Sequence, residues 1–139
     1  MSTHRSLRDL SIGSATVIAV AGMAIHNVVE FGPGFLLDPQ TLIPVAIFAG
    51  LAWACRGPGA RTPMLMLLVA WALLNLVVGG ILSVLLLSIF PFAPEPSVRH
   101  LAVHVVYSLA EIPLVVVSVR ALLASTRHDV PLVETDPTR

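Results

Sequence analysis

Four apolar runs, separated by short polar or proline-rich breaks, constrain this chain more than any other feature. They cover about residues 10–31, 39–55, 63–90 and 98–124. A hydrocarbon core about 30 Å thick needs about 20 helical residues to cross it, so the first and last runs are long enough. The sequence therefore predicts helices that span a membrane.

The second run is shorter than a membrane span of about 20 residues, and the third run is longer. As helices they would be about 26 Å and about 42 Å long, so the second only just crosses the bilayer and the third must tilt, kink or project. Short connections favour antiparallel neighbours. We expect an all-α integral membrane protein, a four-transmembrane-helix antiparallel up-down-up-down bundle. Residues 1–124 would form this single domain, and residues 125–139, which are polar and interrupted by proline, a flexible cytoplasmic tail.

Composition agrees with this class and excludes others. The hydrophobic fraction is 56% and the charged fraction 12%, against about 25% charged residues in soluble domains. The net charge is zero, which argues against a nucleic-acid partner. The single cysteine, Cys55, cannot form an internal disulfide. The expected partner is the lipid bilayer, and membrane-protein partner subunits or a homo-oligomer stay open.

Arginines are distributed unevenly around the four runs. In a four-span arrangement only Arg99 falls on one side, and the opposite side holds all the others: Arg5, Arg8, Arg56, Arg61, Arg120, Arg127 and Arg139. Cytoplasmic loops carry an excess of Lys and Arg. We therefore expect both termini in the cytoplasm and the chain in the plasma (inner) membrane.

The fourth run carries a polar stripe in the stretch HLAVHVVYSLAEIP. His100, His104, Tyr107 and Glu111 are spaced by four, three and four residues, which places them within an arc of about 60° on a helix. A carboxylate facing lipid near the midplane costs about 2.5–3.5 kcal/mol, so the stripe should face the bundle interior. Glu111 must then be protonated, paired or exposed to a water-filled cavity. It is our candidate proton donor or acceptor.

The first run carries a second polar pair in the stretch HNVVE. His26 and Glu30 are four residues apart and share a helix face. His26 and His104 both fall in the outer third of the membrane by depth, and the first and last helices of such a bundle are neighbours. We expect His26, Glu30, His100 and His104 to converge in an intramembrane His/Glu pocket in the outer half.

Two further residues are expected to support this pocket, and each candidate also has a purely structural explanation. Asn75 lies near mid-depth and is a candidate partner of Glu111, with Tyr107 beside it. Asn75 is equally explained as an interhelical hydrogen-bonding residue, and His26 as a packing residue. Glu30 and His100 could instead mark where the helices leave the lipid. Glu111 alone resists a structural explanation.

Three functions remain open from the sequence. The first is an accessory subunit of a larger membrane assembly, whose polar residues fix the register of the helices. The second is a binding module in which His26 and His104, with His100 or Glu30, hold a transition metal or clamp a haem. The chain has no Cys-x-x-Cys-His motif, so such a haem would be non-covalent.

The third function is a small membrane enzyme or a proton relay. Glu111 would exchange a proton with a lipidic substrate or a quinone, with His104 or His26 as the relay. The five residues HNVVE, at positions 26–30, resemble the His-x-x-x-Glu pattern on a membrane helix of sterol isomerase-like proteins. Whether the chain is an enzyme stays open at this point.

Overall fold

The computed structural model describes residues 3–57, 61–84 and 97–128, and these residues are helical with no strand among them. The α-helices are α1 (Thr3–Phe31), α2 (Pro39–Ala54), α3 (Arg61–Leu74) and α4 (Val98–His128). The 3₁₀ helices are η1 (Pro33–Leu37) and η3 (Leu82–Val84), and η2 (Asn75–Ile81) is a π-helix that continues α3.

Three stretches of these helices are long and apolar enough to cross a membrane. They are Ile12–Phe31, Arg61–Val84 and Val98–Thr126. The remaining α-helix, α2, is apolar but has only 16 residues, which correspond to about 24 Å of rise. The all-helical class expected from the sequence is therefore confirmed for the described residues, and the three long apolar stretches indicate a membrane-embedded protein.

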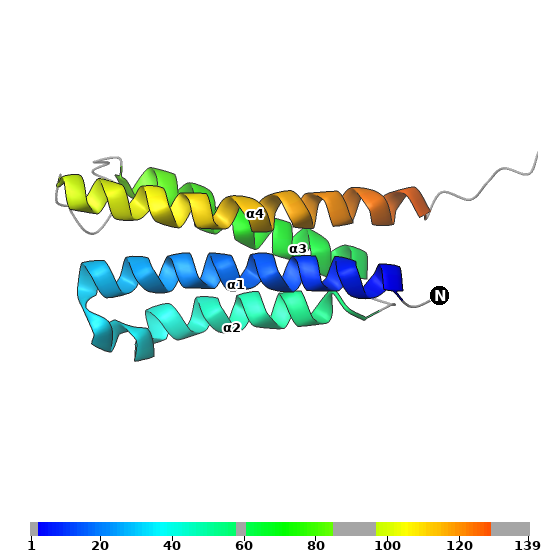
Figure 1. Ribbon diagram of the computed structural model, residues 1–139, viewed down its shortest axis with the longest axis horizontal. Helices are drawn as coiled ribbons and strands as arrows, with labels where there is room; N and C mark the ends of the chain where they lie inside the picture. Colours follow the sequence, from blue (N-terminus) through cyan, green and yellow to red (C-terminus); the bar gives the residue numbers. More distant parts are fainter. Residues whose placement is uncertain (1–2, 58–60, 85–96, 129–139) are drawn as a thin grey trace, which may run out of the picture.

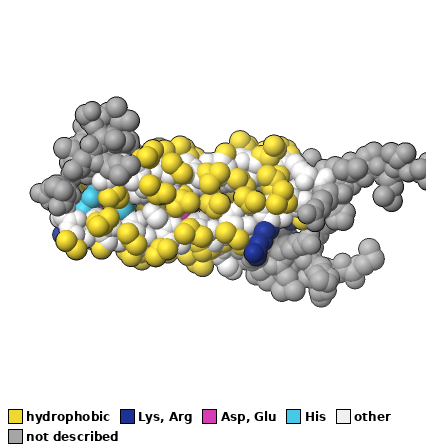
Figure 2. Space-filling view, turned by 90° about the horizontal axis from the view of Figure 1, so that it is seen from above, with side chains coloured by type: hydrophobic (Ala, Val, Ile, Leu, Met, Phe, Trp, Pro, Cys, Tyr) yellow, Lys and Arg dark blue, Asp and Glu magenta, His cyan; other side chains and the backbone are white. Residues whose placement is uncertain are grey.

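The distribution of side chains is inverted relative to that of a soluble protein. Large apolar side chains point away from the molecule, among them Trp53 with 72% and Leu109 with 60% of its surface exposed. Figure 2 shows such side chains scattered over the body of the molecule. Polar residues such as Asn27, His104 and Glu111 are buried instead. This pattern suits a surface in contact with acyl chains, where exposed polar groups are costly.

The helices lie along one long axis (Figure 1). α1 and α2 lie side by side and are joined at one end through η1, α4 packs along the opposite side of α1, and α3 runs behind them, packed against α2 and α4. α1 and α4 approach closely at Gly22, where an added Cβ would lie 2.3 Å from the Cβ of Ala110. A glycine at this position lets the two backbones come into contact.

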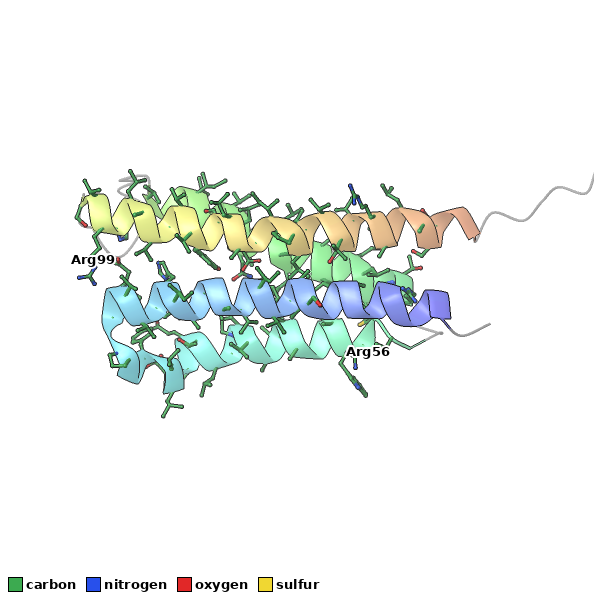
Figure 3. The ribbon with its side chains drawn as sticks, in the orientation of Figure 1. Arg56 and Arg99 are labelled. Carbon is green, nitrogen blue, oxygen red and sulfur yellow. The ribbon has the colours of Figure 1, made fainter. Side chains whose placement is uncertain are left out.

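Arg99 and Arg56 mark the two ends of the molecule (Figure 3). We call these the Arg99 end and the Arg56 end. An apolar core fills the half toward the Arg56 end. Its buried residues are Ile12, Ala15, Ala19, Phe48, Cys55, Leu65, Leu68, Ala72 and Leu114. The buried histidine, asparagine and tyrosine side chains lie in the other half.

Several boundaries differ from those expected. α1 begins at Thr3, before the first apolar run, and α4 continues to His128, so residues 125–128 belong to this helix and not to a tail. A side-chain bond from the Ser125 hydroxyl to the Leu122 carbonyl accompanies this extension. The third run changes from α- to π-helix at Asn75. Residues 85–90 of that run and residues 129–139 of the expected tail lie outside the described residues.

Candidate functional site

The two histidines expected to meet do so in the interface between α1 and α4. Nε2 of His26 lies 3.1 Å from Nε2 of His104. The ring centroids are 4.4 Å apart and the planes are inclined by 69°. His104 is only 4% exposed. We call these two residues the His pair, and a hydrogen bond between their facing nitrogens requires one proton between them.

The second nitrogen of His26 has a partner whose orientation can be assigned. The Thr41 hydroxyl donates to the Phe35 carbonyl over 2.7 Å, so its oxygen accepts from Nδ2 of Asn27 at 2.6 Å. Oδ1 of Asn27 is then the atom that faces Nδ1 of His26, at 2.9 Å. Because Oδ1 can only accept, Nδ1 of His26 carries a hydrogen in this arrangement.

The second nitrogen of His104 meets the π-helix. Nδ1 lies 3.0 Å from the carbonyl oxygen of Gly79 and 3.0 Å from the hydroxyl oxygen of Ser83. At Gly79 an added Cβ would lie 2.9 Å from the Tyr107 ring, so glycine lets η2 approach α4 closely here. π-Helical turns within helices are frequently found at functional sites. Here it places a carbonyl and a hydroxyl on one imidazole nitrogen.

These partners accommodate two charge states of the His pair. In the neutral state the Ser83 hydroxyl donates to Nδ1 of His104, whose Nε2–H donates to His26. With one more proton, Nδ1–H of His104 donates to the Gly79 carbonyl, and the Ser83 hydroxyl turns to a backbone carbonyl that it also reaches, that of Gly79 or Gly80. The heavy atoms keep their places in both states. The His pair can therefore accept one additional proton if the Ser83 hydroxyl rotates.

Glu30 and His100 form a second contact nearer the Arg99 end. Nδ1 of His100 lies 3.0 Å from Oε2 of Glu30. The His100 and His104 rings are 4.4 Å apart between centroids, which brings this contact against the His pair. Oε1 of Glu30 and Nε2 of His100 are buried without a hydrogen-bond partner among the described residues. Arg99, next in sequence, donates to the carbonyl of Val29 beside Glu30.

Tyr107 and Asn75 bond to each other on the other side of the His pair. The Tyr107 hydroxyl donates to Oδ1 of Asn75 over 3.0 Å, and Nδ2 of Asn75 donates to the Trp71 carbonyl over 2.8 Å. The expected pairing of Asn75 with Glu111 is therefore wrong. Tyr107 lies one helical turn nearer the Arg99 end than Glu111, at the level where Asn75 opens the π-helix.

Glu111 is completely buried and has no partner. Its exposed fraction is 0%, and neither carboxylate oxygen has a hydrogen-bond partner among the described residues. Besides Oε1 of Glu30 and Nε2 of His100, two other buried polar atoms of the described residues have no partner, the hydroxyl of Ser118 and the indole nitrogen of Trp71. Native proteins leave few such groups unpaired, so each one needs an explanation.

The geometry discriminates between the two cofactors considered from the sequence. A haem clamped between the rings needs two Fe–N bonds of about 2 Å in line, about 4 Å in all, and the nitrogens of the His pair are 3.1 Å apart. The haem therefore does not fit between the rings as placed. Both nitrogens could reach one metal ion, but no group of three or more His, Cys, Asp or Glu suited to a metal occurs among the described residues.

Sequence reasoning missed three residues that hold the His pair: Asn27, Thr41 and Ser83. Asn27 adjoins His26, and its polarity within an apolar run was the available signal. Thr41 and Ser83 contact the pair's network from other helices, which a linear pattern does not reveal. Comparison of the chain with family models, curated proteins and solved structures finds no match. What the chain does is therefore inferred from this geometry.

Proposed function

We propose that this membrane protein binds one additional proton on the hydrogen-bonded pair of His26 and His104 and relays it through the neighbouring polar side chains. The observation that carries the proposal is the 3.1 Å contact between the two Nε2 atoms, with both Nδ1 atoms bonded to groups that hold them in place. A buried charge is tolerated when hydrogen bonds satisfy it. The His pair has hydrogen-bond partners both in its neutral state and with one additional proton bound.

Glu30 and His100 are the proposed entry to the His pair. Histidine and carboxylate exchange protons readily near neutral pH, and the His100 ring touches that of His104. On the opposite side, Glu111 is the proposed proton donor or acceptor. A lipidic substrate or a quinone is the class of partner that could approach it from the bilayer.

The topology that fits this role has four spans and both termini in the cytoplasm. The arginine distribution supports it, because Arg56 and Arg61 lie at one end of the molecule and Arg99 at the other. In this orientation the Arg99 end and the His pair face the outside of a plasma membrane. α2 would be the fourth span, and its 16 residues would require a thinned bilayer or a neighbouring helix.

Histidine ¹⁵N NMR of the chain in lipid nanodiscs tests the proposal. Between alkaline and mildly acidic pH, the nitrogens of His26 and His104 should change together, with one proton taken up for the two rings. His104→Ala should abolish this joint uptake, and Gly50→Ala, where the added Cβ would meet no atom within 4 Å, should leave it unchanged. Two rings that titrate independently, or that do not titrate at all, would refute the proposal.

Metal binding is a competing outcome of the same sample. Equimolar Zn²⁺ should leave the His26 and His104 signals largely unchanged if the site serves protons, since no third metal ligand joins this pair in a suitable group among the described residues. Tight stoichiometric binding of Zn²⁺ that His26→Ala and His104→Ala each abolish would instead favour a metal module. The two results point to different functions and exclude one another.

An accessory role in a larger membrane assembly is the second candidate. Ala46 and Gly50 on α2 are exposed, and a Cβ added at Gly50 would meet no atom within 4 Å. Small residues let helices approach closely in lipid, and a short span gains from a neighbour. Gentle solubilisation should then recover a defined complex that Gly50→Leu disrupts. Recovery of a single chain in both variants would exclude this role.

A further inference from the structure

We infer that Glu111 is a second proton-binding group and that it exchanges its proton with the Arg99 end only. The inference rests on the proposed function for its entry route through the His pair. Glu111 lies 13 residues after Val98, the first residue of α4, so it is about 20 Å along the helix from that end. It is completely buried, and both its oxygens are free to bind a hydrogen-bond donor.

Polar side chains connect Glu111 to the Arg99 end. The same face of α4 carries His100, His104 and Tyr107 on the preceding turns. The rings of His26 and Tyr107 lie 5.4 Å apart between centroids, and those of His100 and His104 lie 4.4 Å apart. Tyr107 is thus next to the His pair and one turn from Glu111. Each turn of α4 on this side supplies a group that can hold or pass a proton.

Apolar side chains separate Glu111 from the Arg56 end. Leu114, one turn further along α4, is completely buried, as are Leu65 and Leu68 of α3. Ile12 and Ala15 of α1 belong to the same apolar core. This half holds two buried hydroxyls, those of Thr16 and Ser118. Thr16 donates to a carbonyl of its own helix, and Ser118 has no partner among the described residues.

Ionisable groups on the neighbouring helices show the same asymmetry. Among described side chains packed against α4, the acids and bases of α1 are His26 and Glu30, both toward the Arg99 end. The stretch Arg61–Val84, which contains α3, η2 and η3, has one ionisable residue, Arg61, at the Arg56 end. The other described charged groups toward the Arg56 end are Arg56 and Arg120, and the thiol of Cys55 is buried in the apolar core. No described carboxylate or imidazole lies between these groups and Glu111, so a proton on Glu111 leaves toward the His pair.

One-sided access has a consequence for transport. A proton that enters and leaves through the same end does not cross the membrane, so the chain should not dissipate a proton gradient. In the proposed orientation, Glu111 would instead take its proton from the outer solution and hold it in the middle of the bundle.

Carbodiimide labelling of reconstituted wild-type chain tests this inference. Dicyclohexylcarbodiimide enters lipid and reacts with protonated buried carboxyl groups, and mass spectrometry of the peptides identifies the modified residue. In vesicles of determined orientation, the pH on each side is varied separately. Labelling of Glu111 should fall about tenfold for each pH unit above its midpoint when the Arg99 side is made alkaline. It should not respond to the Arg56 side.

Two controls make the result decisive. Glu111→Gln should remove the label, and Tyr107→Phe, which keeps the ring and loses the hydroxyl, should slow the response to a pH jump on the Arg99 side. Labelling that follows the pH of the Arg56 side, labelling that ignores both sides, or a proton flux above that of empty vesicles would each overturn the inference. Failure of the histidine NMR test with one-sided labelling intact would refute the proposed function alone.

Discussion

The contact between α1 and α4 at Gly22 should determine whether the His pair can form. An alanine at position 22 would place its Cβ 2.3 Å from the Cβ of Ala110. Carbon atoms in contact lie about 3.5–4.0 Å apart, so the helices must separate locally by about 1.2–1.7 Å. His26 lies one turn beyond Gly22 on the same face. If the shift reaches it in full, the 3.1 Å contact with His104 exceeds hydrogen-bonding distance.

The cost in stability can be isolated with a matched control. Overpacking of a core contact costs about 1–3 kcal/mol, whereas replacing glycine by alanine inside a helix gains up to about 1 kcal/mol. Gly50→Ala makes the same substitution in α2 where the new Cβ meets nothing within 4 Å. It should show only the gain. The free energy of unfolding of Gly22→Ala should therefore lie about 1–3 kcal/mol below that of Gly50→Ala.

Unfolding by SDS in mixed micelles measures these differences, and histidine NMR reports the His pair in the same variants. Adding Ala110→Gly to Gly22→Ala removes the facing methyl group and should restore both stability and the shared proton. Equal stability of Gly22→Ala and Gly50→Ala, or no rescue by Ala110→Gly, would show that the two helices do not approach as described.

Two further substitutions examine the polar interior by the same unfolding assay. Thr41→Val leaves Nδ2 of Asn27 without its acceptor and removes one of two donors to the Phe35 carbonyl, which also accepts from the Asp38 N–H; we expect a loss of about 1–3 kcal/mol, with Thr41→Ser close to wild type. An equal loss in both variants would assign the effect to packing. Ser118→Ala removes a buried hydroxyl that has no partner among the described residues, so stability should be unchanged or should rise by about 1 kcal/mol. A clear loss would reveal a bond to that hydroxyl.

The helices and the meeting of the histidines could be predicted from the sequence for a simple reason. In a membrane the length of each apolar run and the depth of each polar residue are fixed by the bilayer. Depth alone placed His26 and His104 at the same level, and the stripe on α4 gave the direction in which His104 points. Their contact then required only that the first and last helices be neighbours, as observed.

The partners of the His pair could not be predicted in this way. The hydrogen bond between Thr41 and Asn27 depends on η1, which reverses the direction of the chain so that the start of α2 faces Asn27. Ser83 and the Gly79 carbonyl depend on the π-helix, which changes the phase of the third run after Asn75. The sequence predicted a regular α-helix there.

Hydrogen bonding separates the polar residues that stabilise this fold from Glu111, the carboxylate that has no partner among the described residues. Asn27, Thr41, Asn75 and Ser83 each form hydrogen bonds to other helical segments or to backbone carbonyls, which offsets the cost of burying them in lipid. Glu111 bears a larger cost and receives no such bond. A residue present only for packing would do better as leucine. The position of this carboxyl between the polar and apolar halves of the core is therefore best explained by proton exchange.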